Sequence, residues 1–203
     1  MNLYFPQIEW YYILLSALPF PVFWYFTRFR LRSLLLGVVA LFIAYYIELG
    51  EEMIIGASGE ILMIVFLAPV VEEIVKFLMT WYRKDVRAGV GVGLGFAMIE
   101  NAMYYTYDSA LVGLSTLLMF RELQDPILHS STVSVSVRSW KGIPYIILSI
   151  AMHSIYNIIS LSNNLFEMVA ISSVYAVVLG YMVYRSKKNT FHIMMAWRFT
   201  FQR

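Results

Sequence analysis

Long apolar stretches separated by short polar connections run through the whole chain. Seven of them approach the roughly 20 residues that a helix needs to cross a bilayer, and none shows the strict alternation of apolar and polar positions typical of a half-buried strand. They cover residues 8–26, 33–49, 60–82, 88–107, 109–137, 142–161 and 165–184. The pattern predicts an all-α integral membrane protein, a polytopic bundle of about seven transmembrane helices forming a single domain over residues 1–184.

Composition agrees with a membrane setting. Of the 203 residues, 60% are hydrophobic and 14% are charged, whereas a soluble domain is roughly 25% charged. This excludes an ordinary soluble enzyme or nucleic-acid-binding domain, so we expect a multi-pass protein of the cell membrane, with the lipid bilayer and no nucleic acid as its partners. Cysteine is absent, which excludes disulfides and thiol chemistry.

Basic residues gather in alternate connections between the apolar stretches. Thirteen of the fifteen Lys and Arg residues fall on one face: Arg28, Arg30, Arg32, Arg83, Lys84, Arg87, Arg138, Lys141, Arg185, Lys187, Lys188, Arg198 and Arg203. Acidic residues mark the other face: Glu9, Glu48, Glu51, Glu52, Glu60, Asp108 and Glu167. Because basic loops stay in the cytoplasm, we predict an outside N-terminus, a cytoplasmic C-terminus and a basic cytoplasmic tail over residues 185–203.

Three of the predicted helices carry polar groups near the same depth. Glu72 follows Ile61 by 11 residues, or about 16 Å, which is close to the bilayer midplane. Glu100 and His153 lie at comparable depths in the segments 88–107 and 142–161. An ionisable group at a helix centre costs about 2.5–3.5 kcal/mol, so we interpret the set as a functional polar cavity.

A structural explanation is available for part of this set. Glu72 and Lys76 are spaced i, i+4 and can neutralise one another as an ion pair within the helix. That pair leaves Glu73, Glu100 and two histidines, His129 and His153, without an explanation.

The residue types suggest three kinds of chemistry. A buried carboxylate with an imidazole and an amide can activate a water and hold an oxyanion, and His153 and Asn157 share one helical face. Glu72, Glu100, His129 and His153 also form a plausible zinc shell, and zinc is the alternative cofactor. A third possibility is a non-enzymatic, proton-coupled transporter that uses the carboxylates as a relay.

The segment 109–137 is too long for a plain crossing. Pro126 removes a backbone hydrogen bond, so we predict a broken helix that turns Arg121, Glu122, Asp125 and His129 toward the cavity. Alternatively, 121–126 is a loop at the outer surface with His129 buried nearby. A run of hydroxyl residues follows that could bond to neighbouring helices, and none is singled out as a nucleophile: Ser130, Ser131, Thr132, Ser134 and Ser136.

Glycines recur every second residue in the sequence "RAGVGVGLGF" over 87–96. The pairs Gly89/Gly93 and Gly91/Gly95 have the small-xxx-small spacing that lets helices approach closely. We therefore read the stretch as a packing face rather than a nucleotide loop, and expect it to bring Glu100 toward Glu72.

Three short motifs and one longer stretch resemble those of a known family. "EEIVK" at 72–76, "FAMIEN" at 96–101, "HSIYN" at 153–157 and "RELQDPILH" at 121–129 are similar in order and helix placement to the PrsW family of membrane proteases. That family lies within the wider superfamily of type II CAAX prenyl endopeptidases. The resemblance covers about residues 60–160 and implies an intramembrane endopeptidase of the glutamic type, without a cofactor, that acts on a membrane-anchored protein such as a signalling precursor.

The resemblance also implies roles for residues. Glu72 would activate the attacking water, with Glu73 and Lys76 setting its charge; we favour Glu72 over its neighbour because it shares a helix face with Lys76. Glu100 stands where the CAAX enzymes have a histidine, which puts a prenylated substrate in doubt and leaves His129 to supply the missing imidazole.

The remaining implied site residues lie in the second and third matched motifs. His153 and Asn157 would hold the tetrahedral oxyanion, and Asn101 follows Glu100 within "FAMIEN". The metal-dependent alternative, with zinc on glutamate and histidine ligands, stays open beside this assignment.

Overall fold

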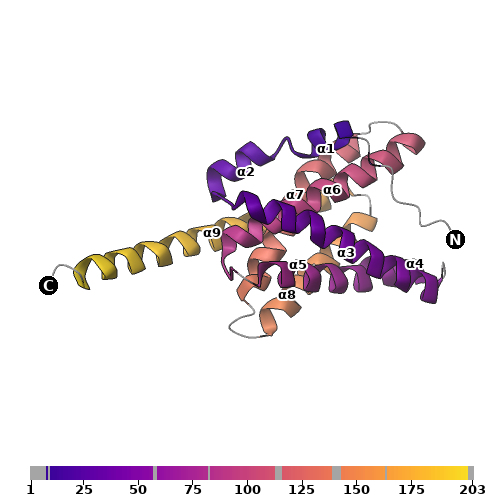
Figure 1. The fold of residues 1–203 in the computed structure, drawn as a ribbon. Coiled ribbons are helices and arrows are strands. Elements are labelled where there is room, and N and C mark those ends of the chain that lie inside the picture. The colour runs from indigo at the N-terminus through magenta and orange to yellow at the C-terminus, as the bar shows by residue number, and fades with distance from the viewer. Residues whose placement is uncertain are drawn as a thin grey trace.

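A computed structural model describes residues 8, 10–56, 59–81, 83–112, 116–138, 143–162 and 164–200, without the side chains of 107–122 and 188–200. Within these residues the fold is entirely helical (Figure 1), as predicted. The helices are α1 (Trp10–Ser16), α2 (Phe20–Thr27), α3 (Leu31–Ile55), α4 (Glu60–Leu62), the π-helix η2 (Met63–Leu67), α5 (Ala68–Thr80), α6 (Val86–Val112), α7 (Thr116–Ser136), α8 (Pro144–Leu161) and α9 (Leu165–Thr200).

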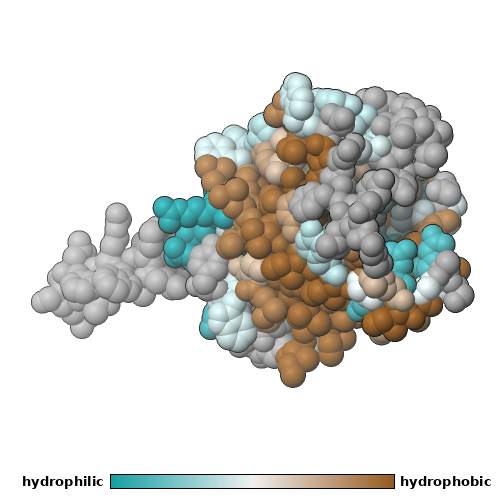
Figure 2. Space-filling view, turned by 45° about the vertical axis from the view of Figure 1, so that its right-hand side comes forward, coloured by the Kyte–Doolittle hydropathy of each residue, from teal (hydrophilic) through white to brown (hydrophobic). Residues whose placement is uncertain are grey.

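Apolar surface identifies a membrane protein. Figure 2 shows a broad hydrophobic band across the middle of one face, with hydrophilic side chains gathered to either side of it. Among the described residues, three helices are long and apolar enough to cross a membrane, over Leu31–Ile55, Pro144–Leu161 and Leu165–Lys187. The number of crossings and the orientation stay predictions.

The first apolar segment is not one helix, so the prediction of a single helix over 8–26 is wrong. α1 ends at Ser16 and α2 begins at Phe20. Pro19 is the N-cap residue of α2, and Pro21 lies in its first turn. Proline lacks a backbone N–H and is accommodated best at a helix start, which explains why the chain begins a new helix here.

The helix that carries "EEIVK" contains a π-helical turn. α4, η2 and α5 follow one another without a gap from Glu60 to Thr80, and the amide of Ala68 donates to the carbonyl of Met63, five residues earlier. Pro69 follows at the start of α5. A proline ring inside an α-helix clashes with the carbonyl four residues before it, and the wider π-turn relieves this clash.

The predicted break at Pro126 is wrong, and so is the alternative loop over 121–126. α7 runs as a helix from Thr116 to Ser136 with Pro126 inside it. Proline is tolerated within transmembrane helices where neighbouring groups satisfy the freed backbone. The boundary placed between 107 and 109 is also wrong, because α6 continues to Val112.

The glycine pattern packs α6 against two helices, as predicted. A Cβ added at Gly93 would lie 2.5 Å from the carbonyl carbon of His129 on α7. A Cβ at Gly95 would lie 2.0 Å from the carbonyl oxygen of Leu34 on α3. Only glycine allows backbones to approach this closely, so α6 occupies the centre of the bundle and brings α7 toward α5.

The last helix continues past the predicted domain boundary at 184/185. α9 extends over 36 residues to Thr200, or about 54 Å at 1.5 Å per residue. This exceeds the roughly 30 Å of a bilayer core, and the C-terminal part of α9 projects away from the other helices (Figure 1). The predicted basic tail is therefore helical over most of its length.

Candidate active site

Glu73 is the most fully bonded carboxylate of the buried cluster. Its side chain is 0% exposed, and its Oε1 lies 2.7 Å from the Nζ of Lys76 and 3.0 Å from the Nδ1 of His153. Thr132 Oγ1 donates to Oε1 at 3.1 Å, and Ser149 Oγ donates to Oε2 at 2.6 Å. With both oxygens engaged, Glu73 is suited to hold other groups in place rather than to react.

Lys76 connects the two glutamates to a histidine. Its buried Nζ donates to Glu72 Oε2 at 3.1 Å and lies 2.7 Å from Glu73 Oε1 and 2.7 Å from His129 Nδ1. It also lies 4.2 Å from the centre of the Phe96 ring. An ammonium has three protons and no lone pair, so these three partners use all of its donors and Nδ1 of His129 must accept.

This bond fixes the tautomer of His129. Since Nδ1 accepts from Lys76, the proton of the neutral ring is on Nε2, which donates to Glu100 Oε2 at 2.6 Å. A chain of hydrogen bonds therefore runs from Lys76 on α5 through His129 on α7 to Glu100 on α6. The structure brings together the "EEIVK" and "FAMIEN" motifs through the imidazole that the sequence suggested.

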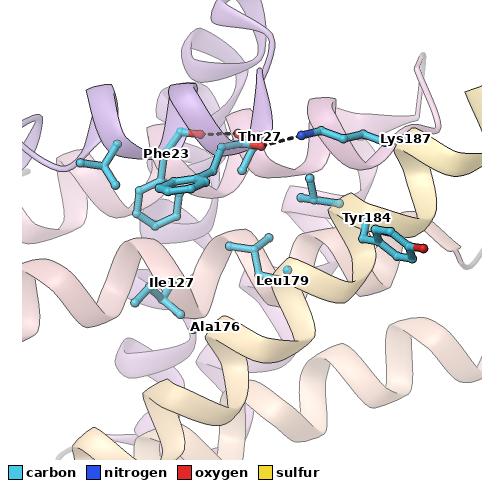
Figure 3. A pocket seen from close by; sticks show the side chains of 11 residues that line it. Phe23, Thr27, Ile127, Ala176, Leu179, Tyr184 and Lys187 are labelled. Carbon is cyan, nitrogen blue, oxygen red and sulfur yellow. Dashed lines mark hydrogen bonds between the residues drawn. The ribbon is translucent and has the colours of Figure 1, made fainter.

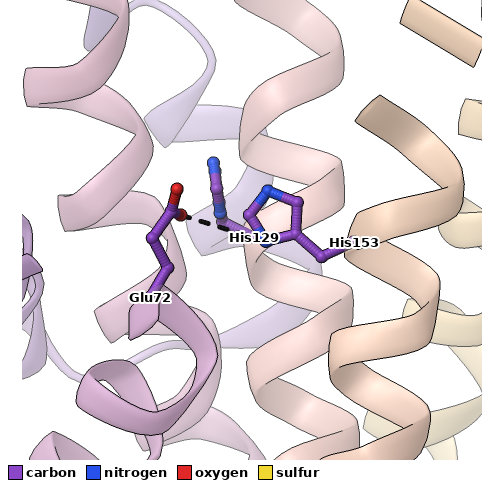
Figure 4. Close-up of side chains that lie close together, drawn as sticks. All are labelled: Glu72, His129 and His153. Atoms are coloured by element: carbon purple, nitrogen blue, oxygen red, sulfur yellow. Dashed lines mark ion pairs between the residues drawn. The ribbon is translucent and has the colours of Figure 1, made fainter. Parts of the chain in front are cut away.

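Glu72, His129 and His153 each offer a ligand atom to one small volume. Figure 4 shows their side chains converging from α5, α7 and α8. One ligand atom from each lies within 4.8 Å of the other two, and all three residues are buried. His153 Nδ1 is 3.9 Å from Glu72 Oε2 and closer to Glu73. Because Nδ1–H donates to that carboxylate, the lone pair of the neutral His153 ring is on Nε2.

The charges of the cluster do not balance among these residues. Glu72, Glu73 and Glu100 supply three carboxylates, and Lys76 supplies one ammonium. Burying an uncompensated ion costs several kcal/mol. Two further positive charges are needed when all three carboxylates are ionised, and either two protons or one divalent cation provides them.

The two predicted asparagines lie apart from these contacts. Asn157 donates its side-chain amide to the carbonyl of Ile64 at 2.7 Å, in the π-turn η2. Asn101 is 2% exposed, and its Nδ2 has no hydrogen-bond partner among the described residues. Neither amide is bonded to the glutamates or histidines, so their predicted catalytic roles stay predictions.

Sequence reasoning did not single out three residues that bond to the cluster or lie near it. Ser149, four residues before His153 on the same face, bonds to Glu73, as does Thr132 from the predicted run of hydroxyl residues. Glu48, assigned from the sequence to the outer acidic face, lies inside α3 and close enough to Glu72 to interact with it electrostatically. The available signal in the sequence for this position of Glu48 was Ala44, which lies four residues earlier on the same helical face.

The acidic residues predicted beside Pro126 are only partly described. Asp125 is buried and accepts a hydrogen bond from the Tyr156 hydroxyl at 3.1 Å, which ties α7 to α8 one turn from each histidine. The side chains of Arg121 and Glu122 lie outside the described residues.

A family model for the PrsW family intramembrane metalloprotease matches residues 27–184, which include every residue of this cluster. The chain belongs to the PrsW family. PrsW proteins are a protease family, so the resemblance seen in the motifs is confirmed, while the placement in the wider CAAX superfamily stays a prediction. Searches of curated proteins and of solved structures found no match.

The family description also bears on the cofactor. It names a metalloprotease, and the structure has a glutamate and two histidines that could hold a metal. Both observations support zinc, the alternative of the sequence analysis. The expected metal-free, glutamic mechanism stays a prediction.

Proposed function

We propose that this PrsW protein is an intramembrane endopeptidase that hydrolyses a peptide bond of a membrane-anchored protein at the cluster around Glu72. The observation that carries the proposal is the convergence of Glu72, His129 and His153 within 4.8 Å. Membership of a protease family supports the reaction class. Burial of the cluster among α5, α6, α7 and α8 supports a substrate that is itself held in the membrane.

The three converging residues fit a divalent metal ion. One glutamate and two histidines with an open fourth position form a known ligand set of catalytic zinc. His153 meets a further requirement, because Glu73 accepts its Nδ1 proton and orients its other nitrogen. A divalent ion also supplies the two positive charges that the cluster lacks. When bound, it would act as a Lewis acid toward the scissile carbonyl.

The other groups then have distinct tasks. Glu100 is the most accessible carboxylate of the cluster, with 16% of its side chain exposed, and we assign it as the general base that accepts a proton from the attacking water. Glu73 and Lys76 are positioning residues, since all of their contacts are with other members of the cluster or its supports. His129 must exchange one of its two hydrogen bonds to become a ligand.

The need for His129 to give up a hydrogen bond before it can bind a metal favours a second candidate mechanism. Both nitrogens of His129 are engaged, Nδ1 by Lys76 at 2.7 Å and Nε2 by Glu100 at 2.6 Å. In this alternative no metal is bound, Glu72 is the base, and two protons balance the charges. It is the glutamic-type reaction that the sequence motifs implied.

Metal content and cleavage measured on the same preparations separate these mechanisms. Purified protein in detergent is incubated with a pool of membrane-segment peptides, and products are identified by mass spectrometry. Bound metal is counted by elemental analysis. The variants are Glu72→Gln and Glu100→Gln, and Glu52→Gln is the matched control because Glu52 is exposed on α3.

The metal mechanism predicts one metal per chain, loss of metal and cleavage in Glu72→Gln, and loss of cleavage alone in Glu100→Gln. Cleavage by a metal-free wild type that disappears in Glu72→Gln would establish the glutamic alternative. Absence of products from the wild type across the pool would contradict the peptidase proposal and favour a transporter. Glu52→Gln is expected to match the wild type in both measurements.

A further inference from the structure

A cavity that shares no lining residue with the cluster lies between α2 and α9. Its volume is about 410 Å³, and Figure 3 shows side chains from both helices facing it, with Ile127 of α7 beside them. Most of the lining is apolar: Val22, Phe23, Phe26, Thr27, Ile127, Ala176, Leu179, Gly180, Val183, Tyr184 and Lys187. The hydroxyl proton of Thr27 is donated to the carbonyl of Phe23 at 2.7 Å. Lys187 is the cation of the lining.

The length of the cavity matches one leaflet of a bilayer. Its lining on α9 begins at Ala176 and ends at Lys187, 11 residues later. This interval is about 16 Å at 1.5 Å per residue, or about half of the roughly 30 Å hydrocarbon core. Lys187 is thus at the polar end of a groove that runs from the basic face toward the middle of the membrane.

The cavity is too narrow for a substrate helix. A helix about 10 Å wide and 16 Å long occupies on the order of 1,200 Å³, which is more than the cavity can hold. An extended peptide is also a poor occupant, because its backbone groups would lack hydrogen-bond partners against apolar walls. A flexible hydrocarbon chain is thinner than a helix and has no backbone groups that need hydrogen-bond partners.

The mouth of the cavity provides cations for a headgroup. Lys187 donates to the carbonyl of Phe26 at 3.1 Å, and its ammonium has two more protons to donate. Arg28 caps α2 in the left-handed region, with its guanidinium 4.4 Å from the centre of the Trp24 ring. These charges at the basic face favour an anionic headgroup over a zwitterionic one.

We propose that this cavity binds one acyl chain of an anionic phospholipid, with its phosphate at Lys187. The lipid fills the gap between α2 and α9, where Lys187 makes a direct polar link between the two helices. Its chain rests on Ile127, two residues before His129 on α7. Binding is a property of the fold and does not depend on the peptidase reaction.

Gly180 allows the cavity to be filled without a clash. A Cβ at Gly180 meets nothing within 4 Å, so Gly180→Leu places an isobutyl group in the cavity and also raises helix propensity. Val177→Leu is the matched control, because Val177 is on the same helix, is 72% exposed and is not part of the lining.

The test measures lipid retained by purified protein after exchange into mixed phosphatidylglycerol and phosphatidylcholine micelles, by native mass spectrometry. Wild type and Val177→Leu are expected to retain one phosphatidylglycerol per chain. Gly180→Leu should bind it about 16-fold more weakly, since an isobutyl group excludes at least two methylenes and each lowers the affinity about fourfold. Equal retention by Gly180→Leu and wild type would overturn the acyl-chain site.

A second variant tests the headgroup. Lys187→Gln should reduce the preference for phosphatidylglycerol over phosphatidylcholine about fivefold, the contribution of one lysine near an anionic surface. An unchanged preference in Lys187→Gln would overturn the assignment of the phosphate to Lys187. Because Lys187 is exposed at the end of the groove, this variant keeps the core intact and remains informative if Gly180→Leu folds poorly.

Discussion

The hydrogen bond from Asn157 to Ile64 gives a prediction that separates a structural role from a catalytic one. In the π-turn, Ala68 donates to the carbonyl of Met63, and the residue in position to donate next, to Ile64, is Pro69. Proline has no N–H. The carbonyl of Ile64 therefore lacks a backbone donor in this pattern, and the amide of Asn157 supplies one at 2.7 Å.

Replacing Asn157 by leucine removes this donor while keeping the side-chain volume similar. A buried carbonyl left without a partner costs about 1–3 kcal/mol, and side-chain hydrogen bonds between membrane helices average about 0.6 kcal/mol with a maximum near 1.7. Asn157 is only half-buried, so we expect Asn157→Leu to lower the free energy of unfolding by about 1 kcal/mol.

A double-mutant cycle tests the cause. Pro69→Ala restores the missing N–H, so in that background the carbonyl of Ile64 no longer depends on Asn157 and the cost of Asn157→Leu should fall below about 0.3 kcal/mol. Unfolding free energies are measured in mixed micelles by titration with a denaturing detergent, and peptide cleavage is measured on the same four proteins.

Two results would refute this reasoning. A cost that stays near 1 kcal/mol in the Pro69→Ala background would show that the bond to Ile64 is not its source. Unchanged stability with cleavage lowered about 10²–10³-fold would show instead that Asn157 stabilises an oxyanion, since that is the loss expected on removing such a donor.

Two further substitutions test the packing and charges that hold the cluster. Gly93→Ala places a Cβ 2.5 Å from the carbonyl carbon of His129, so we expect a loss of about 1–3 kcal/mol of stability together with most of the cleavage activity. Gly50→Ala is the control, because nothing lies within 4 Å of a Cβ at Gly50. Equal stability and activity of the two alanine variants would contradict the close-packing argument. Glu73→Gln leaves Lys76 paired with Glu72 but weakens the hydrogen bonds that Glu73 accepts from Ser149 and Thr132, so we expect it to lower the unfolding free energy by about 1–3 kcal/mol. An unfolding midpoint like that of the wild type would show that Glu73 is not the central support of the cluster.

Sequence reasoning was most successful where the signal is local. Hydropathy predicted an all-helical membrane protein, and helical spacing placed Glu72, Lys76 and His153 in positions that the structure brings together. Sequence reasoning failed to predict where the prolines interrupt a helix. Pro19 starts a new helix, whereas Pro126 lies within a continuous one, and the difference depends on which neighbours can satisfy the backbone.

The sequence by itself determined the membrane setting, the set of polar residues held at one depth and the glycine face that brings their helices together, because each depends on residues within one or two helical turns. Only the tertiary structure decided that Glu73 is fully bonded, that Lys76 fixes the tautomer of His129 and that Asn157 completes the π-turn. Those contacts, apart from that between Glu73 and Lys76, join residues at least 53 positions apart. No periodicity along the chain specifies which of several possible donors and acceptors meet once the helices pack.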